Sequence, residues 1–426
     1  MSDTQAQRQR TTASDRPVGG SLRLLPLVQG VTERLSAHLA RNGQARCRGT
    51  ALVRAVGQAG LTGRGGAAFP TDVKLAAVAG ASGRKAVIAN GAEGEPGSVK
   101  DAVLLRHVPH LVLDGLQLAA EAVGATEAYL YTGAWLAGWV RQTLAQRADD
   151  VPVTVIEAPP RFLSGQETAV VSRVSGGLSL PTFSPRRVSE RGVNGAPTLV
   201  QNVETLAHLA LIARHGPDWF RQLGTPAEPG TTLVTVNAGG RRTVTEVELG
   251  TALADVITTV GTAVLIGGYH GTWLPMTTAL SLTLDNRALR RHHAALGAGV
   301  LAVLPRQACG LVETARVTRY LAAESAGQCG PCLNGLPRIA AAMAELAGPR
   351  PRRGTVQAVE RWAGLVTGRG ACHHPDGTAR LVRSALTVFA VELGRHANGR
   401  CSATTHHPVL PLPRAEEMPL TDEDWL

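Results

Sequence analysis

Short apolar segments alternate with longer amphipathic segments between residues 84 and 157. The apolar runs Ala86–Ala89, Ala128–Thr132 and Val153–Glu157 have the length and composition of buried strands. The stretches between them, His110–Val123 and Trp135–Arg147, repeat their apolar residues at helical spacing. Strands and helices that alternate in this way predict βαβ units and a parallel sheet. The predicted fold class is therefore α/β.

The remainder of the chain divides where the pattern changes. The Gly-, Ser-, Pro- and Arg-rich stretch 175–198 predicts a long loop, and Pro226–Gly230 is typical of a linker. A small β-grasp-like pattern follows the linker, and an apolar run, Gly297–Leu304, precedes helical segments. Further predicted helices are Val31–Leu39, Thr50–Ala59, Asn202–His215, Leu253–Val260 and Val312–Ala323, and further predicted strands are Thr232–Asn237, Arg242–Glu248 and Ala263–Ile266. We expect a disordered lead-in at 1–20, an α/β domain at 21–229, a β-grasp domain at 230–296, a helical domain at 297–400 and a tail at 401–426.

A glycine-rich loop precedes the first strand of the alternating region. Gly63, Gly65 and Gly66 permit positive φ and a close approach of the backbone to a ligand, and Lys74 follows one helical stretch later. Successive N–H groups in such a loop suit a phosphate, although the loop alone is equally compatible with a simple turn. The strand Ala86–Ala89 ends in Asn90, Glu93 and Glu95. Ligands of open α/β sheets bind beyond such strand ends, so loop, lysine and acidic strand end together predict a binding site.

Composition narrows the class of protein. Hydrophobic residues make up 44% of the 426 residues. The sequence contains no run of about 18 apolar residues, so we expect no transmembrane helix. The polar start, Met1–Pro17, lacks the apolar core of a signal peptide, so we expect a cytoplasmic protein. The net charge of +10 is dispersed and not interleaved with aromatics, which argues against nucleic-acid binding. Such a surface favours either recruitment of an acidic electron carrier or simple solubility.

Six cysteines in a chain of this kind indicate metal or redox chemistry rather than disulfides. Cys329 and Cys332 form a Cys-x2-Cys turn, Cys372 follows them, and Cys309 precedes them. Four thiolates can hold a [4Fe–4S] cluster. The spacing is equally compatible with structural zinc held by the three clustered cysteines and by Cys309, His373 or His374. Cys401 is assigned to the tail, where it forms a weaker group with His406 and His407. Cys47 is assigned to the core.

Several ordered motifs resemble the NADH-quinone oxidoreductase-F family, whose members bind flavin and NADH in bacterial respiratory complex I. The resemblance runs from about Gly60 to Gly394 and includes the flavin subunits of NAD-linked hydrogenases and formate dehydrogenases. The stretches that carry it are Gly63–Thr71, Asn90–Asp101, Gly165–Ala169 and Pro197–Thr205. It implies a Rossmann-like FMN-binding domain, a β-grasp domain and a helical bundle that carries an iron–sulfur site.

The resemblance also implies roles for individual residues. Glu93 and Glu167 would be catalytic-site residues in the nicotinamide nucleotide pocket, together with Phe69 and Phe162. The other implied cofactor-binding residues are Gly63, Arg64, Gly65, Gly66, Lys74, Asn90, Gln166, Gln201 and Asn202. NAD(P)H would pass a hydride to FMN, and electrons would leave through a [4Fe–4S] cluster. The implied partners are a ferredoxin-like or thioredoxin-like [2Fe–2S] protein and a membrane-bound reductase subunit, with attachment at the inner face of the membrane through partners.

The chain departs from the family pattern at several positions. Ala92 replaces an Asp, Gln166 a Glu and Gln201 an Asn, and Arg187 falls near an aromatic position of a poorly aligned loop. Ala326 occupies the position of the first cluster cysteine.

For the fourth cluster ligand we therefore hypothesise Cys309, brought back by folding of the intervening helix. The alternatives are a non-cysteine ligand such as His373, or no cluster. The alternatives for function are a non-catalytic electron-transfer or assembly subunit and a zinc-stabilised ligand-binding module.

Overall fold

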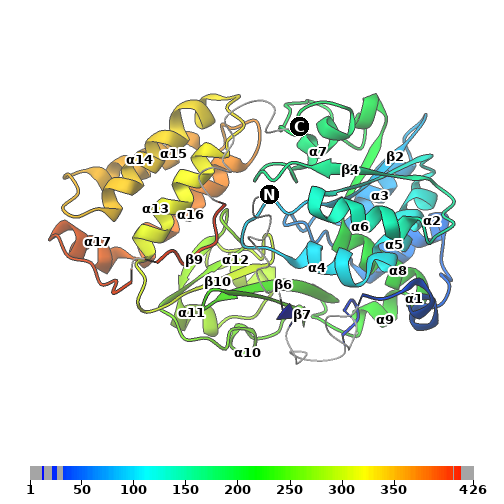
Figure 1. Ribbon diagram of the computed structural model, residues 1–426, viewed down its shortest axis with the longest axis horizontal. Helices are drawn as coiled ribbons and strands as arrows, with labels where there is room; N and C mark the ends of the chain where they lie inside the picture. Colours follow the sequence, from blue (N-terminus) through cyan, green and yellow to red (C-terminus); the bar gives the residue numbers. More distant parts are fainter. Residues whose placement is uncertain (1–11, 14–21, 26–31, 406, 414–426) are drawn as a thin grey trace, which may run out of the picture.

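The computed structural model describes residues 12–13, 22–25, 32–405 and 407–413. Figure 1 shows an α/β unit on the right, a second sheet below, and a group of helices on the left. Within the described residues, no helix is both long and apolar enough to cross a membrane.

The α/β unit is built on four parallel strands in the order β4-β3-β2-β5. The strands are β2 (Ala86–Gly91), β3 (Glu127–Gly133), β4 (Val153–Ala158) and β5 (Thr198–Asn202). The predicted parallel sheet is confirmed, and β2, β3 and β4 are each slightly longer than the predicted strands. Strand β5 was not predicted from the sequence. It pairs with β2 and directly follows the long predicted loop 175–198.

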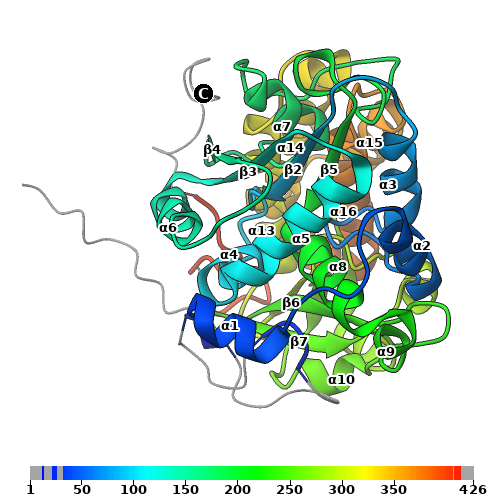
Figure 2. The same ribbon diagram turned by 90° about the vertical axis from the view of Figure 1, so that its right-hand side faces the viewer.

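Helices cover both faces of this sheet. The helices of the unit are α1 (Leu35–Asn42), α2 (Gly49–Ala59), α3 (Thr71–Ala79), α4 (Lys100–His107), α5 (Pro109–Val123), α6 (Ala134–Leu144), α7 (Glu167–Val174), α8 (Val203–His215) and α9 (Pro217–Arg221). Figure 2 shows α2, α3, α5 and α8 in front of the strands, and their apolar residues form the largest core. A Cβ at Gly115 in α5 would lie 2.0 Å from the carbonyl oxygen of Leu206, so glycine permits α5 and α8 to touch. The opposite face packs against α7 and the loop that follows it.

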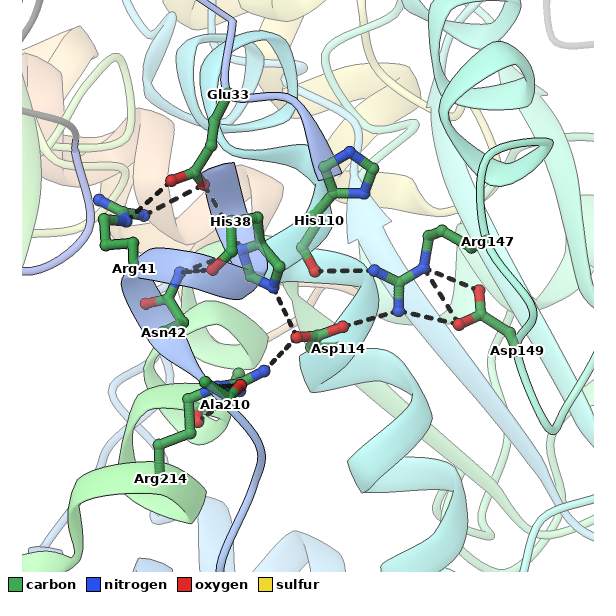
Figure 3. A network of polar contacts seen from close by, with 11 residues as sticks. Glu33, His38, Arg41, Asn42, His110, Asp114, Arg147, Asp149, Ala210 and Arg214 are labelled. Carbon is green, nitrogen blue, oxygen red and sulfur yellow. Dashed lines mark hydrogen bonds and ion pairs between the residues drawn. The ribbon is translucent and has the colours of Figure 1, made fainter. Parts of the chain in front are cut away.

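A buried polar network joins α1 to α5 and α8 around the Asp114 carboxylate (Figure 3). His38 Nε2 donates to Asp114 over 2.7 Å, Arg147 donates over 2.6 Å, and Arg214 also pairs with it. Burial favours the neutral acid, but these donors outweigh burial and hold the pKa of Asp114 far below its usual range. The network therefore fixes the N-terminal helix to the α/β unit through charge rather than through apolar packing.

The second sheet has six strands in the order β1-β7-β6-β10-β8-β9. They are β1 (Thr12–Ala13), β6 (Thr231–Ala238), β7 (Arg241–Glu248), β8 (Ala263–Ile266), β9 (Thr272–Pro275) and β10 (Val300–Leu304), accompanied by α10 (Leu253–Val256), α11 (Met276–Leu280) and α12 (Asn286–Arg290). The predicted lead-in at 1–20 lies outside the described residues except for β1, which pairs with β7. The apolar run that we placed at the start of the helical domain contributes β10, a central strand of this sheet.

The helical region contains α13 (Gly310–Ala323), a π-helical turn at Pro331–Gly335, α14 (Leu336–Ala347), α15 (Thr355–Val366), α16 (His374–Val388) and α17 (Ala390–Ala397). Leu336, Ile339 and Met343 of α14 contribute to the core that α13, α15 and α16 share with it. Of the predicted tail, residues 401–405 and 407–413 are described, and the backbone N–H of Leu410 donates to Glu313 of α13 over 2.8 Å. The tail therefore packs against the helical region as far as it is described.

Candidate functional site

The order of the four parallel strands reverses between β2 and β5, and the crevice is the region beyond the carboxyl ends of these two strands. The chain continues from β2 to β3 and β4 on one side and returns to β5 on the other side. Asn90 is paired with Asn202 at the carboxyl ends of these two strands, and Ala89 with Gln201. A reversal of strand order of this kind leaves an open crevice where ligands of α/β proteins bind.

The glycine-rich loop lies at this end of β5. The N–H of Gly63 donates to the carbonyl of Phe69 over 2.9 Å, which closes the loop, and the N–H of Arg64 donates to the Thr205 hydroxyl in α8 over 2.9 Å. A Cβ at Gly65 would lie 3.4 Å from the Cβ of Asn202, so the loop rests against the crevice. Gly66 has φ +110, a conformation that side chains disfavour.

The Arg64 side chain is buried behind the loop. Its guanidinium donates to the Thr62 hydroxyl over 3.0 Å and to the Pro229 carbonyl over 3.4 Å. Burial lowers the pKa of this guanidinium. Arg64 therefore anchors the loop to the linker before the second sheet.

Lys74 lies on α3, and its side chain reaches the middle of β5. Its ammonium donates to Glu167 at the start of α7 over 2.6 Å and to the Val200 carbonyl over 3.4 Å. The Lys74 side chain is 33% exposed and that of Glu167 is 41% exposed, so both remain accessible. The structure thus brings Lys74 and Glu167 together at the edge of the crevice.

Side-chain amides surround the same strand ends. Asn90 donates to the Gly165 carbonyl over 2.9 Å, and Asn202 donates to Asp101 over 2.6 Å while its oxygen caps α8. The Gln166 oxygen accepts from the N–H groups of Thr168 and Ala169 and so caps α7. The Gln201 amide nitrogen is buried and has no partner among the described residues. An unpaired buried donor at a ligand crevice is satisfied when a polar ligand binds.

Two glutamates follow β2, and both carboxylates are held by the protein. Glu93 accepts from the Ser98 hydroxyl over 2.6 Å and from the backbone N–H groups of Asp101 and Ala102 over 3.0 Å each. Glu95 is half-buried and accepts from the Tyr269 N–H over 2.7 Å. Burial, only partly offset by this hydrogen bond, raises the pKa of Glu95 to about 7. Glu95, to which the sequence assigned no role, is therefore one of two carboxyl groups near this strand end, with Asp101, whose pKa burial raises to about 7.

A buried charged cluster lies next to Asn202, and the sequence did not predict it. Lys100 donates to Asp101 over 2.6 Å and to Glu204 over 2.9 Å, and all three side chains are buried. Lys100 also donates to the Asn202 oxygen over 3.4 Å. These residues belong to two of the matched stretches of sequence, but their burial depends on packing between α4, α8 and β6. The cluster therefore fixes the Asn202 side chain through Lys100 and Asp101.

The two aromatic residues that the resemblance assigned to the nucleotide pocket lie in different surroundings. Phe69 is 42% exposed at the end of the glycine-rich loop. The Phe162 ring packs edge-on against His270 with ring centroids 4.7 Å apart, and its centroid lies 5.6 Å from that of His374. The backbone N–H of Phe162 donates to Glu324, the residue that ends α13, over 2.9 Å. Phe162 therefore joins the α/β unit to the helical region.

Three cysteines gather at the end of α13 that carries Glu324. Burial raises the pKa of the Cys332 thiol to about 12, and the neighbouring Cys329 and Cys372 thiols add to the effect. His373, beside Cys372, is fully exposed and its Nδ1 faces Asp376 at 3.3 Å. His374 is buried with one ring nitrogen on the Leu321 carbonyl and the other on His270, so it is not free to bind a metal. The group offers three thiols, and His373 beside Cys372 in the chain offers one accessible imidazole.

Cys309 does not join this group, contrary to our hypothesis. It precedes α13, so the whole 14-residue helix, about 21 Å long, separates it from the three cysteines. The helix does not fold back. Cys309 instead lies against His396 of α17, with Sγ and Nε2 3.6 Å apart.

The fold and site define a class: a nucleotide-binding α/β unit with its crevice at a strand reversal, joined by an aromatic contact to a cysteine-bearing helical region. Comparison with known proteins gives the same division. Residues 56–211 match the Nuo51 FMN-binding domain, and residues 313–396 match the NADH-ubiquinone oxidoreductase-F iron–sulfur binding region. The chain belongs to the NADH-quinone oxidoreductase-F family.

Individual relatives agree with this assignment. An NADH-quinone oxidoreductase-F protein of Rhizobium meliloti is 27% identical over 376 residues, which cover 82% of this chain and 89% of the relative. The mitochondrial NADH dehydrogenase [ubiquinone] flavoprotein 1 of Dictyostelium discoideum is 27% identical over 364 residues, which cover 78% of this chain and 76% of the relative. The structure of an NAD+-reducing [NiFe]-hydrogenase in the H2-reduced state superimposes with a TM-score of 0.73 at 29% identity over 82% of this chain. This chain spans 62% of that hydrogenase chain.

Proposed function

We propose that this chain is the NAD(P)H-oxidising subunit of an electron-transfer oxidoreductase, with FMN in the crevice and an iron–sulfur cluster at the three-cysteine group. The observation that carries the proposal is a contact between the two regions that hold these sites: the backbone N–H of Phe162, after β4, donates to Glu324, which ends the helix before the cysteines. When bound, the flavin accepts a hydride from the nicotinamide and releases single electrons to the cluster.

The residues at the crevice fit a flavin mononucleotide. The N–H groups of Gly65 and Gly66 and the Lys74 ammonium would bind its phosphate. Gln201 supplies the buried amide donor that lacks a partner among the described residues. Asn90 and Asn202, fixed by hydrogen bonds to Gly165 and Asp101, would orient the ligand from the strand ends.

The accessible edge of the crevice fits a dinucleotide. Glu167 stands beside Lys74 and is 41% exposed, and Phe69 offers an exposed ring. Glu93 is held by three donors at the start of α4, which fixes its carboxylate rather than leaving it free for proton transfer. We therefore propose that Glu93 positions the loop after β2, and that Glu167 and Phe69 contact NAD(P)H.

At the cluster we propose ligation by Cys329, Cys332 and Cys372, with His373 as the fourth ligand. His373 is next to Cys372 in the chain and its side chain is fully exposed, so its Nε2 is available. Buried thiols bind metal as thiolates, so loading of the cluster would release their protons to solvent.

A second candidate function, a non-catalytic electron-transfer or assembly subunit, is favoured by one observation. Ala326 removes a family cluster ligand, and Cys309 lies too far away to replace it. A chain whose cluster is missing or labile would bind FMN but pass electrons poorly. A third candidate, the zinc-stabilised ligand-binding module, would require zinc at the three-cysteine group instead of iron.

We also propose the domain division 21–229, 230–304 and 305–400, in which the boundary expected at 297 moves so that β10 belongs to the middle domain. The β-grasp class of that domain is supported by the β6–β7 hairpin and by the parallel pairing of β6 with β10. A ferredoxin-like or thioredoxin-like [2Fe–2S] protein and a membrane-bound reductase subunit are proposed as partners on family grounds. Cytoplasmic placement at the inner face of the membrane through such a partner is part of the same proposal.

The test is a visible spectrum of the anaerobically purified, cluster-reconstituted protein before and after addition of NADH or NADPH. Bleaching of the flavin band by either nucleotide establishes the dehydrogenase and identifies its electron donor. Flavin that does not respond to either nucleotide, or an iron–sulfur spectrum without flavin, supports the electron-transfer subunit. A colourless protein that contains zinc contradicts both functions.

A further inference from the structure

A second group of metal-ligand side chains lies at the opposite end of α13 from the three cysteines. Cys309 precedes the helix, Glu392 and His396 lie one turn apart on α17, and Cys401 follows α17. One ligand atom from each of the four lies within 4.8 Å of the ligand atoms of the other three. Cys309, Glu392 and His396 are buried, and Cys401 is exposed. Three separate segments of chain therefore converge on one point.

The separations within this group suit a single tetrahedral ion. Cys309 Sγ and His396 Nε2 are 3.6 Å apart, and His396 Nε2 and Glu392 Oε1 are 3.5 Å apart. Zinc–sulfur bonds of about 2.3 Å and zinc–nitrogen or zinc–oxygen bonds of about 2.1 Å place neighbouring tetrahedral ligands roughly 3.5 Å apart. Donors this close enclose one ion rather than a four-iron cluster.

The ligands are also oriented by partners outside the group. His396 Nδ1 donates to the Leu346 carbonyl at the end of α14 over 2.9 Å, which fixes the tautomer and leaves Nε2 with its lone pair towards the group. Ser402 donates to both Glu392 oxygens, over 2.7 and 2.6 Å, and the Ala403 N–H donates to Cys401 Sγ over 3.4 Å. A histidine and a carboxylate held in this way are typical of metal ligands.

We propose that Cys309, Glu392, His396 and Cys401 bind a structural zinc ion. Two thiolates, one imidazole and one carboxylate fill all four positions of zinc, so no position is left for a water or a substrate. Binding deprotonates the two thiols and releases two protons to solvent. Two thiolates and one carboxylate exceed the charge of the ion by one, and Arg395, which donates to Glu392 over 3.1 Å, offsets the excess.

The ion would fasten the tail to the helical region. Cys401 is the first residue of the predicted tail, and further along the tail Val409 and Leu410 donate backbone N–H groups to Glu313. Glu313 lies on the first turn of α13, the helix that Cys309 precedes. Zinc would therefore tie the start of α13, the end of α17 and the tail together, independently of the flavin and of the three-cysteine group.

The test measures zinc and iron per chain in the anaerobically purified holoprotein and in four variants. We expect about one zinc per chain in the wild type, and at least a fivefold loss of zinc in Cys309→Ser and in Cys401→Ser with iron unchanged. Cys329→Ser should lose iron and keep its zinc. Cys47→Ser, which changes a cysteine outside both groups, should keep both metals.

X-ray absorption at the zinc edge of the wild-type protein gives a second readout that does not depend on the folding of a variant. Two sulfur and two nitrogen or oxygen neighbours support the site. Three or more sulfur neighbours, or zinc lost with Cys329→Ser but kept in Cys401→Ser, would place the ion at the three-cysteine group and overturn the proposal. A wild type without zinc, whether or not Cys309 and Cys401 are oxidised to a disulfide, overturns it as well.

Discussion

The crevice between β2 and β5 and the three-cysteine group have both departed from the family pattern, but with different structural consequences. In the crevice, Gln166 replaces a Glu and still caps α7 through its side-chain oxygen. Gln201 replaces an Asn and still presents an amide nitrogen at the strand end. At the cysteines, Ala326 replaces a ligand with a methyl group that cannot bind a metal.

The difference follows from the chemistry that each site requires. A hydrogen-bond acceptor can be exchanged between carboxylate and amide because both have a carbonyl-type oxygen. Metal ligation has no such tolerance, since the ion requires a thiolate, imidazole or carboxylate at a fixed distance. We therefore expect the crevice to keep its ligand, and the cluster to be the weaker of the two sites. Substitutions at each site test that contrast.

The largest expected effect is the loss of iron in Cys332→Ser. Cys332 is the buried member of the group, and Cys309 cannot replace it because it lies at the far end of α13. Iron per chain should fall at least tenfold, measured by metal analysis after anaerobic reconstitution, while flavin content stays within a factor of two. The Cys47→Ser protein serves as the control. Retention of iron in Cys332→Ser would show that the cluster is held elsewhere.

The crevice should respond to loss of Lys74. In Lys74→Met the phosphate of FMN loses a charge-assisted hydrogen bond, worth about 1.5–3 kcal/mol, so the dissociation constant should rise roughly 10- to 100-fold. Flavin fluorescence titration of the deflavinated protein measures this. Lys85→Met is the matched control, because Lys85 binds the Ala79 and Val123 carbonyls away from the crevice. Equal losses of affinity in the two variants would contradict the placement of FMN at Lys74.

The sequence predicted the crevice better than the cysteine region, for a physical reason. The glycine loop Gly63–Gly66, Lys74 and Asn90 stand in local sequence motifs, so they could be recognised as one candidate site without knowledge of the strand order. Strand β5 was missed because its five residues follow a long loop and are embedded in a motif that continues into α8.

The position of Cys309 depends instead on contacts between residues distant in the sequence. No local sequence feature shows that Cys309 and the three cysteines lie at opposite ends of α13. None shows that Cys401 of the tail lies beside the first residues of that helix. The burial of Lys100 with Glu204 was hidden for the same reason, because it depends on packing between two helices.

A cysteine at position 326 should restore the cluster ligand that Ala326 lacks and bring the stability of the cluster closer to that of flavin binding in the crevice. The backbone N–H of Gly327 lies against the Cys332 thiol, so its neighbour Ala326 is close to the group. In Ala326→Cys we expect a fourth thiolate on the cluster and a several-fold longer half-life of its absorbance in air. Ser325→Cys, one residue away, is the control. Equal behaviour of Ala326→Cys and the wild type would show that the fourth position is already filled by a ligand as good as cysteine.

The smallest effect concerns the stability of the α/β unit and depends on the polar network in Figure 3. Burial lowers the pKa of His38, but hydrogen bonds to Asp114 and Glu33 outweigh burial, and the pKa is raised above 6.5. The stability that His38 adds is therefore complete below pH 6.5 and is lost as the pH rises through the folded-state value. The neighbouring His110 acts in the opposite direction, because burial and Arg147 lower its pKa to about 4. As the pH falls below 6.5, the His110 ring gains a proton in the unfolded chain but not yet in the folded protein, which favours the unfolded chain.

The combined contribution of these two histidines to the melting temperature should accordingly be largest near pH 6.5 and fall on both sides of it. In His38→Gln the loss on the alkaline side should disappear, so the difference in melting temperature between this variant and the wild type narrows by a few degrees between pH 6 and pH 8.5. In His110→Gln the decrease in melting temperature below pH 6.5 should be smaller than in the wild type, and the decrease above pH 6.5 should be unchanged. Calorimetric scans of the three proteins across this range measure both effects. A difference between wild type and His38→Gln that stays constant with pH would mean that His38 remains in one charge state throughout, and that the network holds α1 by hydrogen bonding alone.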